Sequence, residues 1–367
     1  MGMELEKQEN TEVFKLTPGD LDHLFRRSGL IGNKLSPFRY DAEQAAISSP
    51  SEYFKALAES PRLNQVAGCL LEPDLKIEFY RGGAGTADET YYVLLSKPDQ
   101  AVAAQFVNSG GEYLVLLFDD WASYLEWWSQ IYVSTGIGSY QAVFPKVMDT
   151  EVLICALHCI DIYRRSYMES MLDYSGDLNL SLTIQDYVDL LKRAVVSRDK
   201  RWLLPTLLEL TPGLKSSDIA LKPEHIKQLE ELGFAAESES VLTLDERSRI
   251  MGTEFITGWM GGLGVQATAL IKGEECSLSR VFLAPTAFAN HLISFETGSG
   301  GEGRFRHQAS TAEELKQTLG KWMETLQKAV GGLAAAKTAE PKMKFCGQCG
   351  SKIRSGKKFC TNCGKAV

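Results

Sequence analysis

Residues 91–118 read Tyr-Tyr-Val-Leu-Leu-Ser-Lys-Pro-Asp-Gln-Ala-Val-Ala-Ala-Gln-Phe-Val-Asn-Ser-Gly-Gly-Glu-Tyr-Leu-Val-Leu-Leu-Phe. Three runs rich in aromatic and branched apolar residues are separated here by Pro98 and by the Gly110-Gly111 pair. Proline and paired glycines interrupt regular structure, so this stretch predicts three antiparallel strands in succession. The run Asp-Asp-Trp-Ala-Ser-Tyr-Leu-Glu-Trp-Trp-Ser follows at 119–129 and predicts a closing helix.

The same order of elements recurs in the second half of the chain. Arg-Val-Phe-Leu at 280–283 is followed by Pro285 and then by Leu-Ile-Ser-Phe-Glu-Thr-Gly-Ser-Gly-Gly at 292–301. A weaker third strand is expected at 303–308, and a helix after it. Strand, break, strand and glycine turn therefore occur twice in the same order, which indicates an internal repeat.

Each copy of this pattern is preceded by a similar helix start. Leu-Thr-Pro-Gly-Asp at 16–20 and Leu-Thr-Ile-Gln-Asp at 182–186 both place an aspartate three positions after a threonine. A threonine side chain at this position accepts a hydrogen bond from the first turn and so marks a helix N-terminus. Ser310 and Glu313 have the spacing of a capping box and predict the start of the last helix.

These patterns predict an α+β fold of two pseudo-symmetric halves, each made of antiparallel sheet and helices. Extra helices are expected at 148–172 and 201–210. An alternative is that any two α+β halves look alike at this level; we favour a duplication because the helix start and the strand order both recur. The expected boundaries are 12–172 and 173–330 for the halves, 331–341 for a linker and 342–367 for a small C-terminal domain.

The C-terminal residues contain two matching motifs, Lys344-Phe-Cys-Gly-Gln-Cys-Gly and Lys358-Phe-Cys-Thr-Asn-Cys-Gly. A Cys-x-x-Cys turn places two sulfurs close enough to share one ion, and the following glycine permits the tight turn. A pair of disulfides is the alternative, but paired motifs of this kind in a reduced compartment indicate metal binding. The sequence therefore predicts a zinc ribbon with one structural Zn²⁺ bound by Cys346, Cys349, Cys360 and Cys363.

Charge is distributed unevenly along the chain. The net charge is −8, yet the residues from Pro341 onward carry seven Lys or Arg and no acid, so the rest has 32 basic against 47 acidic residues. An acidic body repels phosphate, which leaves the basic tail as the segment able to contact nucleic acid. No apolar run reaches the length of a membrane span and the N-terminus has no signal pattern, so we expect a cytoplasmic location.

Local motifs of catalysis are missing from the sequence. The glycine runs at 82–85, 261–264 and 298–301 lack the Gly-Lys-Ser/Thr of a phosphate loop and read as turns, and the five histidines are scattered. We therefore expect no enzymatic activity; the alternative is an enzyme whose site is assembled from distant residues. Cys155 and Cys159 could form a metal or redox pair, but we favour a buried helix in which they pack as small apolar side chains.

Two groups of large apolar residues are candidates for partner binding. An aromatic stripe at 121–128 has helical spacing and is expected to pack on the sheet. Trp127 lies beside this stripe and is a candidate anchor, since tryptophan is enriched at interface hot spots. Trp259 and Met260 lie in the glycine-rich run Thr-Gly-Trp-Met-Gly-Gly and are candidates for the same reason.

Several longer runs match a known pattern. The second half has Ser-Arg-Val-Phe-Leu-Ala-Pro-Thr-Ala-Phe at 279–288 and Leu-Ile-Ser-Phe-Glu-Thr-Gly-Ser at 292–299. The first half has Pro-Ser-Glu-Tyr-Phe-Lys-Ala-Leu at 50–57, Lys-Ile-Glu-Phe-Tyr at 76–80 and Glu-Thr-Tyr-Tyr-Val-Leu at 89–94. In its hydrophobic positions and turns, the chain from about residue 12 to 330 resembles the EspG family.

That resemblance implies a fold and a function. The EspG family consists of cytosolic chaperones of ESX (type VII) secretion systems, with a pseudo-twofold fold, which cap the apolar tip of helical PE–PPE heterodimers. A non-enzymatic protein that binds a helical secretion substrate is therefore expected here, with the ribbon as an added docking tail. An alternative is a regulator whose zinc ribbon binds nucleic acid through the basic tail.

Overall fold

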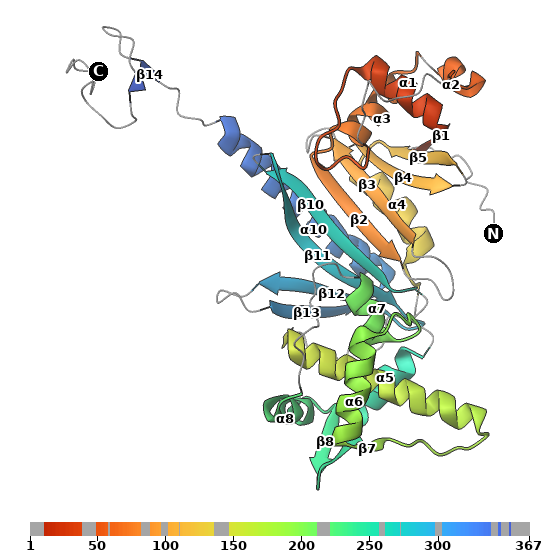
Figure 1. Cartoon of the computed structure of the whole chain (residues 1–367), viewed down its shortest axis with the longest axis vertical. Helices are drawn as coiled ribbons and strands as arrows, with labels where there is room; N and C mark the ends of the chain where they lie inside the picture. Colours follow the sequence, from red (N-terminus) through yellow and green to blue (C-terminus); the bar gives the residue numbers. More distant parts are fainter. Residues whose placement is uncertain are drawn as a thin grey trace.

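The computed structural model describes residues 11–38, 49–57, 59–81, 89–96, 102–109, 111–135, 147–210, 221–256, 261–271, 273–297, 303–338, 344–345 and 352–353. One antiparallel sheet of ten strands runs through the molecule, with helices on both of its faces (Figure 1). Its spatial order is β1 (Thr11–Leu16), β5 (Glu112–Phe118), β4 (Val102–Ser109), β3 (Glu89–Ser96), β2 (Leu75–Arg81), β10 (Leu263–Ile271), β11 (Glu274–Pro285), β12 (Asn290–Thr297), β13 (Gly303–Ser310) and β6 (Val147–Asp149).

The centre of the sheet is the pairing of β2 with β10. These strands are antiparallel, in a register that runs from Leu263 opposite Arg81 to Ala269 opposite Leu75. From this centre the chain meanders outward in both directions, through β3, β4 and β5 on one side and through β11, β12 and β13 on the other. The predicted α+β class with antiparallel strands is confirmed, and the strands of the two halves belong to a single sheet.

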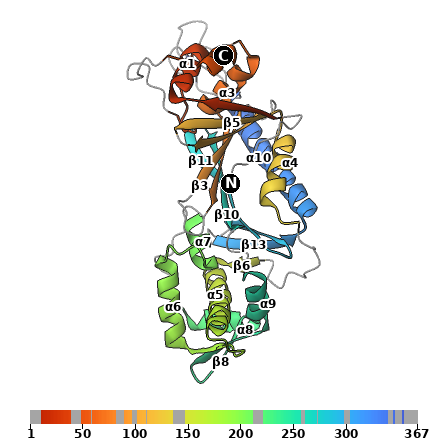
Figure 2. The ribbon, with the colours of Figure 1, turned by 90° about the vertical axis from the view of Figure 1, so that its right-hand side faces the viewer.

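One face of the sheet is covered by the two helices that follow β5 and β13. These are α4 (Trp121–Tyr132) and α10 (Ala312–Thr338), which lie side by side (Figure 2). Their apolar residues share one core with side chains from β2, β5, β10 and β11. The closing helices expected after each set of strands therefore pack against the same surface.

The opposite face near β1 and β5 is covered by α1 (Pro18–Ser28), α2 (Glu52–Leu57) and α3 (Pro61–Leu71). Successive residues of a strand point to opposite faces. On β5, Val115 and Leu117 pack in this second core, whereas Leu116 and Phe118 pack under α4. The run Leu-Val-Leu-Leu-Phe is apolar at every position because both of its faces are buried.

A layer of helices covers the opposite face of the other half of the sheet. It contains α5 (Thr150–Leu172), α6 (Ile184–Val196), α7 (Leu203–Leu210), α8 (Pro223–Glu231) and α9 (Glu246–Glu254), with a small sheet of β7 (Ser181–Thr183), β9 (Val241–Leu244) and β8 (Ala235–Ser238).

The long helix α5 is the centre of this layer and is buried continuously from Val152 to Arg164. It follows β6, which pairs with β13, so residues 147–172 pack with elements later in the chain. The two extra helices expected from the sequence correspond to α5 and α7. Among the described helices, none has both the length and the apolar character needed to cross a membrane.

Two predicted helix starts are confirmed and a third is shifted. Thr17 accepts a hydrogen bond from Asp20 N (3.2 Å), and Thr183 accepts one from Asp186 N (3.0 Å). The capping box of α10 uses Thr311 and Glu314, not Ser310 and Glu313. Ser310 is the last residue of β13, where strand pairing extends one residue further than the local spacing indicates.

Candidate functional site

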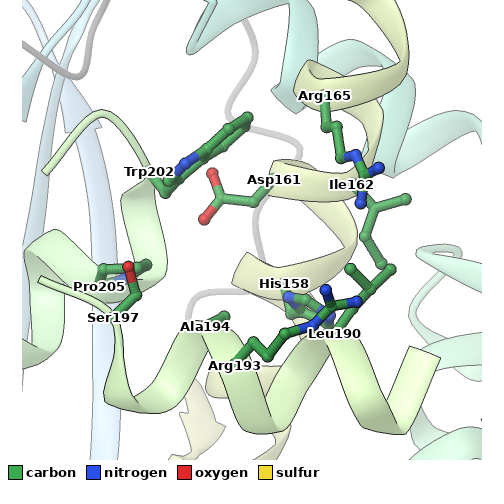
Figure 3. Close-up of a pocket in the computed structure, with 10 residues that line it drawn as sticks. All are labelled: His158, Asp161, Ile162, Arg165, Leu190, Arg193, Ala194, Ser197, Trp202 and Pro205. Atoms are coloured by element: carbon green, nitrogen blue, oxygen red, sulfur yellow. The ribbon is translucent and has the colours of Figure 1, made fainter. Parts of the chain in front are cut away.

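A cavity of about 320 Å³ lies between α5, α6 and the segment that leads into α7 (Figure 3). Figure 3 shows Trp202 and Pro205 on the opposite side of the cavity from Ile162 and Arg165. Its volume lies in the range typical of small-molecule sites. The lining residues are His158, Asp161, Ile162, Arg165, Leu190, Arg193, Ala194, Ser197, Trp202 and Pro205.

The two long helices line this cavity with the same residue spacing. The lining residues occupy positions i, i+3, i+4 and i+7, starting from His158 on α5 and from Leu190 on α6, where the last position is Ser197, the residue that caps the helix. Residues at this spacing lie on one face of a helix. The facing sides of α5 and α6 thus form two walls, and Trp202 and Pro205 form a third.

Asp161 holds the α7 end of the cavity in place. One carboxylate oxygen contacts Arg164 Nη1 (2.6 Å) and accepts a hydrogen bond from Leu203 N (2.9 Å), while the other accepts one from Leu204 N (2.9 Å). Burial raises the pKa of the Asp161 carboxyl, although the Arg164 charge and the two backbone amides act in the opposite direction. Both oxygens are therefore engaged, at the N-terminus of α7, where negative charge is favoured.

Arg164 is fixed by the same arrangement. Its side chain is fully buried, its Nη2 donates to the Arg201 carbonyl oxygen (2.9 Å), and its guanidinium lies over the Trp202 ring, 5.6 Å from the ring centroid. The ion pair with Asp161 thus ties α5 to the residues before α7 and orients the tryptophan that forms one wall of the cavity.

His158 is the most deeply buried imidazole beside this cavity. It is 4% exposed, both ring nitrogens are inaccessible to solvent, and neither meets a partner with good hydrogen-bond geometry among the described residues. The Tyr187 ring meets the imidazole edge-on at 4.9 Å between centroids. Burial lowers the pKa of His158 to about 3, and a weak hydrogen bond with the backbone of Tyr187 opposes this to a smaller extent. The ring is therefore neutral near pH 7, with one nitrogen able to donate and the other able to accept.

Two arginines bring positive charge to the cavity. Arg165 is half-exposed, and its Nε pairs with Glu169 at 2.7 Å. Arg193 is exposed, and its Nε donates to the Asp189 carbonyl oxygen of its own helix at 3.3 Å. In the described part of the chain, no carboxylate pairs with Arg193. The Asp161 charge is balanced by Arg164 and the Arg165 charge by Glu169, which leaves Arg193 as the lining charge that no carboxylate pairs with among the described residues.

The cysteines on α5 are packing residues, as the sequence favoured. Cys155 and Cys159 are both free thiols and both fully buried. Burial raises the pKa of Cys155 to about 12 and raises that of Cys159 as well, so neither forms the thiolate that metal binding or redox chemistry requires. Tyr187 lies across them and donates from its hydroxyl to the Cys155 carbonyl oxygen (2.9 Å).

A second buried polar cluster joins the helical layer to the sheet. Glu254 Oε1 at the end of α9 contacts His291 Nε2 (2.5 Å), and His291 Nδ1 contacts His307 Nε2 (2.9 Å). Thr286 donates from its hydroxyl to Glu254 Oε1 (3.0 Å). His291 and His307 are far apart in the sequence, but the adjacent strands β12 and β13 bring them together. All four residues of this cluster are buried, so the cluster connects structural elements.

The structure corrects the expectation that Trp127 is an exposed anchor. Its side chain is 8% exposed and packs against Phe118 and Tyr124, with ring centroids 5.4 and 6.0 Å away. It is buried because α4 packs on the sheet with α10 beside it, so that Trp127 belongs to the core shared by both helices and the sheet. The other two candidates, Trp259 and Met260, lie outside the described residues.

The four cysteines of the predicted ribbon (Cys346, Cys349, Cys360 and Cys363) also lie outside the described residues. Two short strands are described beside the first pair, β14 (Lys344–Phe345) and β15 (Lys352–Ile353), and they pair antiparallel with Lys344 opposite Ile353. These paired strands flank the first Cys-x-x-Cys motif in the sequence, which suits a ribbon. Elsewhere in the described chain, no group of three or more His, Cys, Asp or Glu is arranged to hold a metal ion.

Comparison with known proteins identifies this C-terminal segment. Residues 345–367 match the family model of the zinc-ribbon domain, a match that includes all four predicted ligand cysteines. No curated protein matches the chain. The tail is thus similar to zinc-ribbon domains, a class whose members bind zinc through cysteine thiolates.

Proposed function

We propose that this protein is a non-enzymatic binding protein of the EspG type, a chaperone or adaptor for helical substrates of a type VII secretion system. In this proposal the zinc ribbon is a docking tail built on one structural Zn²⁺. A helical substrate with an apolar tip aggregates unless the tip is covered, and a sheet with flanking helices offers surfaces for helix recognition.

The observation that carries the proposal is the strand order of the ten-stranded sheet. Two four-stranded meanders meet at β2 and β10 and run outward in mirrored order. Each is followed by a helix, α4 or α10, and the two helices lie together on one face (Figure 2). This is the arrangement expected of two related halves about a twofold axis, which the resemblance to the EspG family implies.

The chemistry of the buried polar groups supports a non-catalytic role. Asp161 is engaged by Arg164 and by two amides of α7, and Glu254 is engaged by His291 and Thr286. Acid–base catalysis needs a group that can reach a bound substrate. The buried carboxylates of these clusters contact other protein groups instead.

The donor set at the C-terminus fits zinc. Two Cys-x-x-Cys motifs supply four thiolates, which match the tetrahedral preference of Zn²⁺, and the β14–β15 pairing brackets the first motif. We propose Cys346, Cys349, Cys360 and Cys363 as the four ligands. The bound ion would supply folding free energy to a segment that is too short to form an apolar core.

An affinity-capture experiment tests the proposed function. The full-length protein is compared with the variant Cys346→Ser/Cys349→Ser, and with Cys276→Ser as a control that changes a cysteine of β11 outside the ribbon. We expect all three to retain small helical secretion substrates, and the presence of the protein to keep these substrates soluble.

Two other results would contradict this proposal. Capture of nucleic acid that is eluted by salt and lost in the ribbon variant would favour a regulator that acts through the basic tail. Failure to retain any helical secretion substrate would remove the basis for a chaperone function.

A further inference from the structure

The C-terminal end of α5 carries large apolar side chains that the fold leaves uncovered. Met171 is 55% exposed, Leu172 77% and Tyr174 99%. They lie within four consecutive residues, at the end of a helix whose first half is buried. Figure 1 shows this end projecting past the other helices of the layer, away from the ten-stranded sheet. Single exposed apolar residues are ordinary, whereas a contiguous group indicates a contact surface. We call residues 171–174 the α5 tip.

Tyr174 is held in a backbone conformation that tyrosine rarely adopts. Its φ is 53°, in the left-handed region that glycine and asparagine favour after a helix. Two hydrogen bonds fix the chain there: Tyr174 N donates to the Met171 carbonyl oxygen (3.3 Å), and Ser175 N donates to the Ser170 carbonyl oxygen (3.0 Å). Because the ring is almost fully exposed, its packing does not offset this strain. Strain of this kind is typical of sites that serve a function.

The charges at the α5 tip oppose the usual preference of a helix end. A helix C-terminus carries partial negative charge and favours Lys, Arg or protonated His. The last turn of α5 has no basic residue, and Asp173 occupies its C-cap, with Asp177 exposed shortly after it. The nearest arginine along the helix, Arg165, is already paired with Glu169 (2.7 Å). The tip is thus a place of negative potential that a cation from outside the chain would relieve.

Three features therefore coincide at the α5 tip: uncovered apolar side chains, a left-handed tyrosine and an acidic helix end. Each lowers the stability of the protein alone, and such departures from local rules are expected at functional sites. One kind of partner relieves the apolar exposure and the negative charge together, namely one with apolar and basic groups side by side. Anionic lipids and a second α5 tip both carry negative charge, so both are disfavoured. A segment of another protein is the occupant that fits.

We propose that the α5 tip is a docking site for a protein segment that offers apolar side chains flanked by Lys or Arg. Met171 and Leu172 contact the apolar side chains of this segment, and Asp173 pairs with one of its basic groups. The Tyr174 ring offers its face to the same groups through a cation–π contact. The site is separate from the zinc ribbon. The inference is based on α5 alone, so it holds whether or not the protein serves type VII secretion.

Selection from a phage-displayed library of helical peptides tests this proposal. The library fixes leucine along one helix face and varies the flanking positions among Lys, Arg, Asp, Glu and Ser. The full-length protein and the variant Leu172→Ser/Tyr174→Ser are immobilised in parallel. We expect the peptides enriched on the wild type alone to carry Lys or Arg in the flanks. Fluorescence anisotropy should show their affinity weakened by about tenfold in Asp173→Asn, as for the loss of one charged contact.

Tyr174→Asn separates the role of the ring from that of the backbone. Asparagine adopts the left-handed region more readily, so this variant should melt at a higher temperature while its affinity for the selected peptides falls. Glu239→Asn is the matched control, because Glu239 has nearly the same φ (51°) in the exposed turn between β8 and β9. It should also melt at a higher temperature but bind the peptides as the wild type does.

Four results would overturn the proposal. The first is that no peptide is enriched on the wild type over the double variant. The second is enrichment of acidic or uncharged flanks. The third is self-association of the protein that the double variant abolishes, which would assign the tip to a second copy. The fourth is a lower melting temperature of Tyr174→Asn with unchanged peptide affinity, which would make Tyr174 structural. The changed residues are exposed, so the variants should fold, and circular dichroism checks this.

Discussion

Two ion pairs on α5 differ in burial, and their loss should have different consequences. Asp161 and Arg164 are buried and 2.6 Å apart, whereas Arg165 and Glu169 are half-exposed and 2.7 Å apart. Asp161→Asn leaves the Arg164 charge buried without its counter-ion, so we expect a loss of about 3–5 kcal/mol in unfolding free energy. Glu169→Gln breaks a pair that water already screens, so we expect a loss below about 1 kcal/mol. Urea unfolding of both variants measures the difference.

The same comparison separates the cost of an unpaired charge from the value of the pair. The double variant Asp161→Leu/Arg164→Met removes both charges, and we expect it to recover part of the stability lost in Asp161→Asn. Equal losses in Asp161→Asn and Glu169→Gln would contradict the buried geometry of the first pair.

His158 gives the fold a pH dependence whose sign follows from its burial. Its pKa is lowered from 6.5 to about 3, so between these values the unfolded chain binds a proton that the folded chain excludes. Stability is therefore complete above pH 6.5 and is lost as the pH falls through this window, by a few kcal/mol, on the order of 1.4 kcal/mol per pH unit. Arg165 and Arg193 line the same cavity and oppose a further positive charge, while Asp161 is balanced by Arg164.

Denaturant unfolding between pH 7 and pH 4 measures this effect as a difference between wild type and His158→Phe. The other acid-sensitive groups are present in both proteins and cancel in the comparison. We expect a smaller loss of stability toward low pH in the variant. An identical pH profile for the two proteins would show that His158 is solvated or paired in the folded state.

At the scale of elements, the helical layer depends on a close contact between α5 and α9. A Cβ atom at Gly252 would lie 2.1 Å from Tyr163 Cδ1, so alanine there requires α9 to move away from α5. We expect Gly252→Ala to cost about 1–3 kcal/mol, the usual range for overpacking. Gly320→Ala in α10 is the matched control, since no heavy atom lies within 4 Å of its added Cβ. It should stabilise the protein by up to about 1 kcal/mol.

Thermal unfolding of the two alanine variants provides the measurement, with opposite signs expected for the shift in melting temperature. Two stabilised proteins would mean that α9 is free to shift relative to α5. The comparison uses one type of substitution in two helices, so helix propensity is the same in both and the packing contact decides the sign.

Helix starts and strands could be predicted where the residues that define them lie close together in the sequence. The caps at Thr17 and Thr183 follow from three-residue spacings, and the apolar run of β5 reflects burial on both faces. The cap of α10 was placed one residue early because Ser310–Glu313 and Thr311–Glu314 have the same local form. Pairing with β12 extends β13 through Ser310, so the helix begins one residue later and Thr311–Glu314 forms the cap.

At the scale of the whole molecule, the ribbon and the body should respond independently to metal removal. The three apolar cores of the described residues contain no residue beyond Val330. We expect one Zn²⁺ per chain, lost on chelation or in Cys346→Ser, with the main thermal transition unchanged because the body buries its own core. Metal analysis measures the zinc content, and calorimetry measures the main thermal transition of the body. A large drop in the main transition would show that the ribbon packs on the body.

The sequence by itself determined the α+β class, the starts of α1 and α6 and the zinc-ribbon motif at the C-terminus. These depend on spacings within a few residues, such as Cys-x-x-Cys, and are therefore readable without a structure. A family model for residues 345–367 agrees with the ribbon.

Only the tertiary structure decided which faces meet. It joined β2 to β10 as the centre of one sheet, buried Trp127 in the core against Phe118, and paired His291 with His307 and Glu254. The lining residues of α5 and α6 have the spacing of any buried helix face, so the sequence cannot distinguish a face that packs from one that borders a cavity. Both outcomes have the same local pattern, because contacts between residues far apart in the chain leave no trace in local spacing.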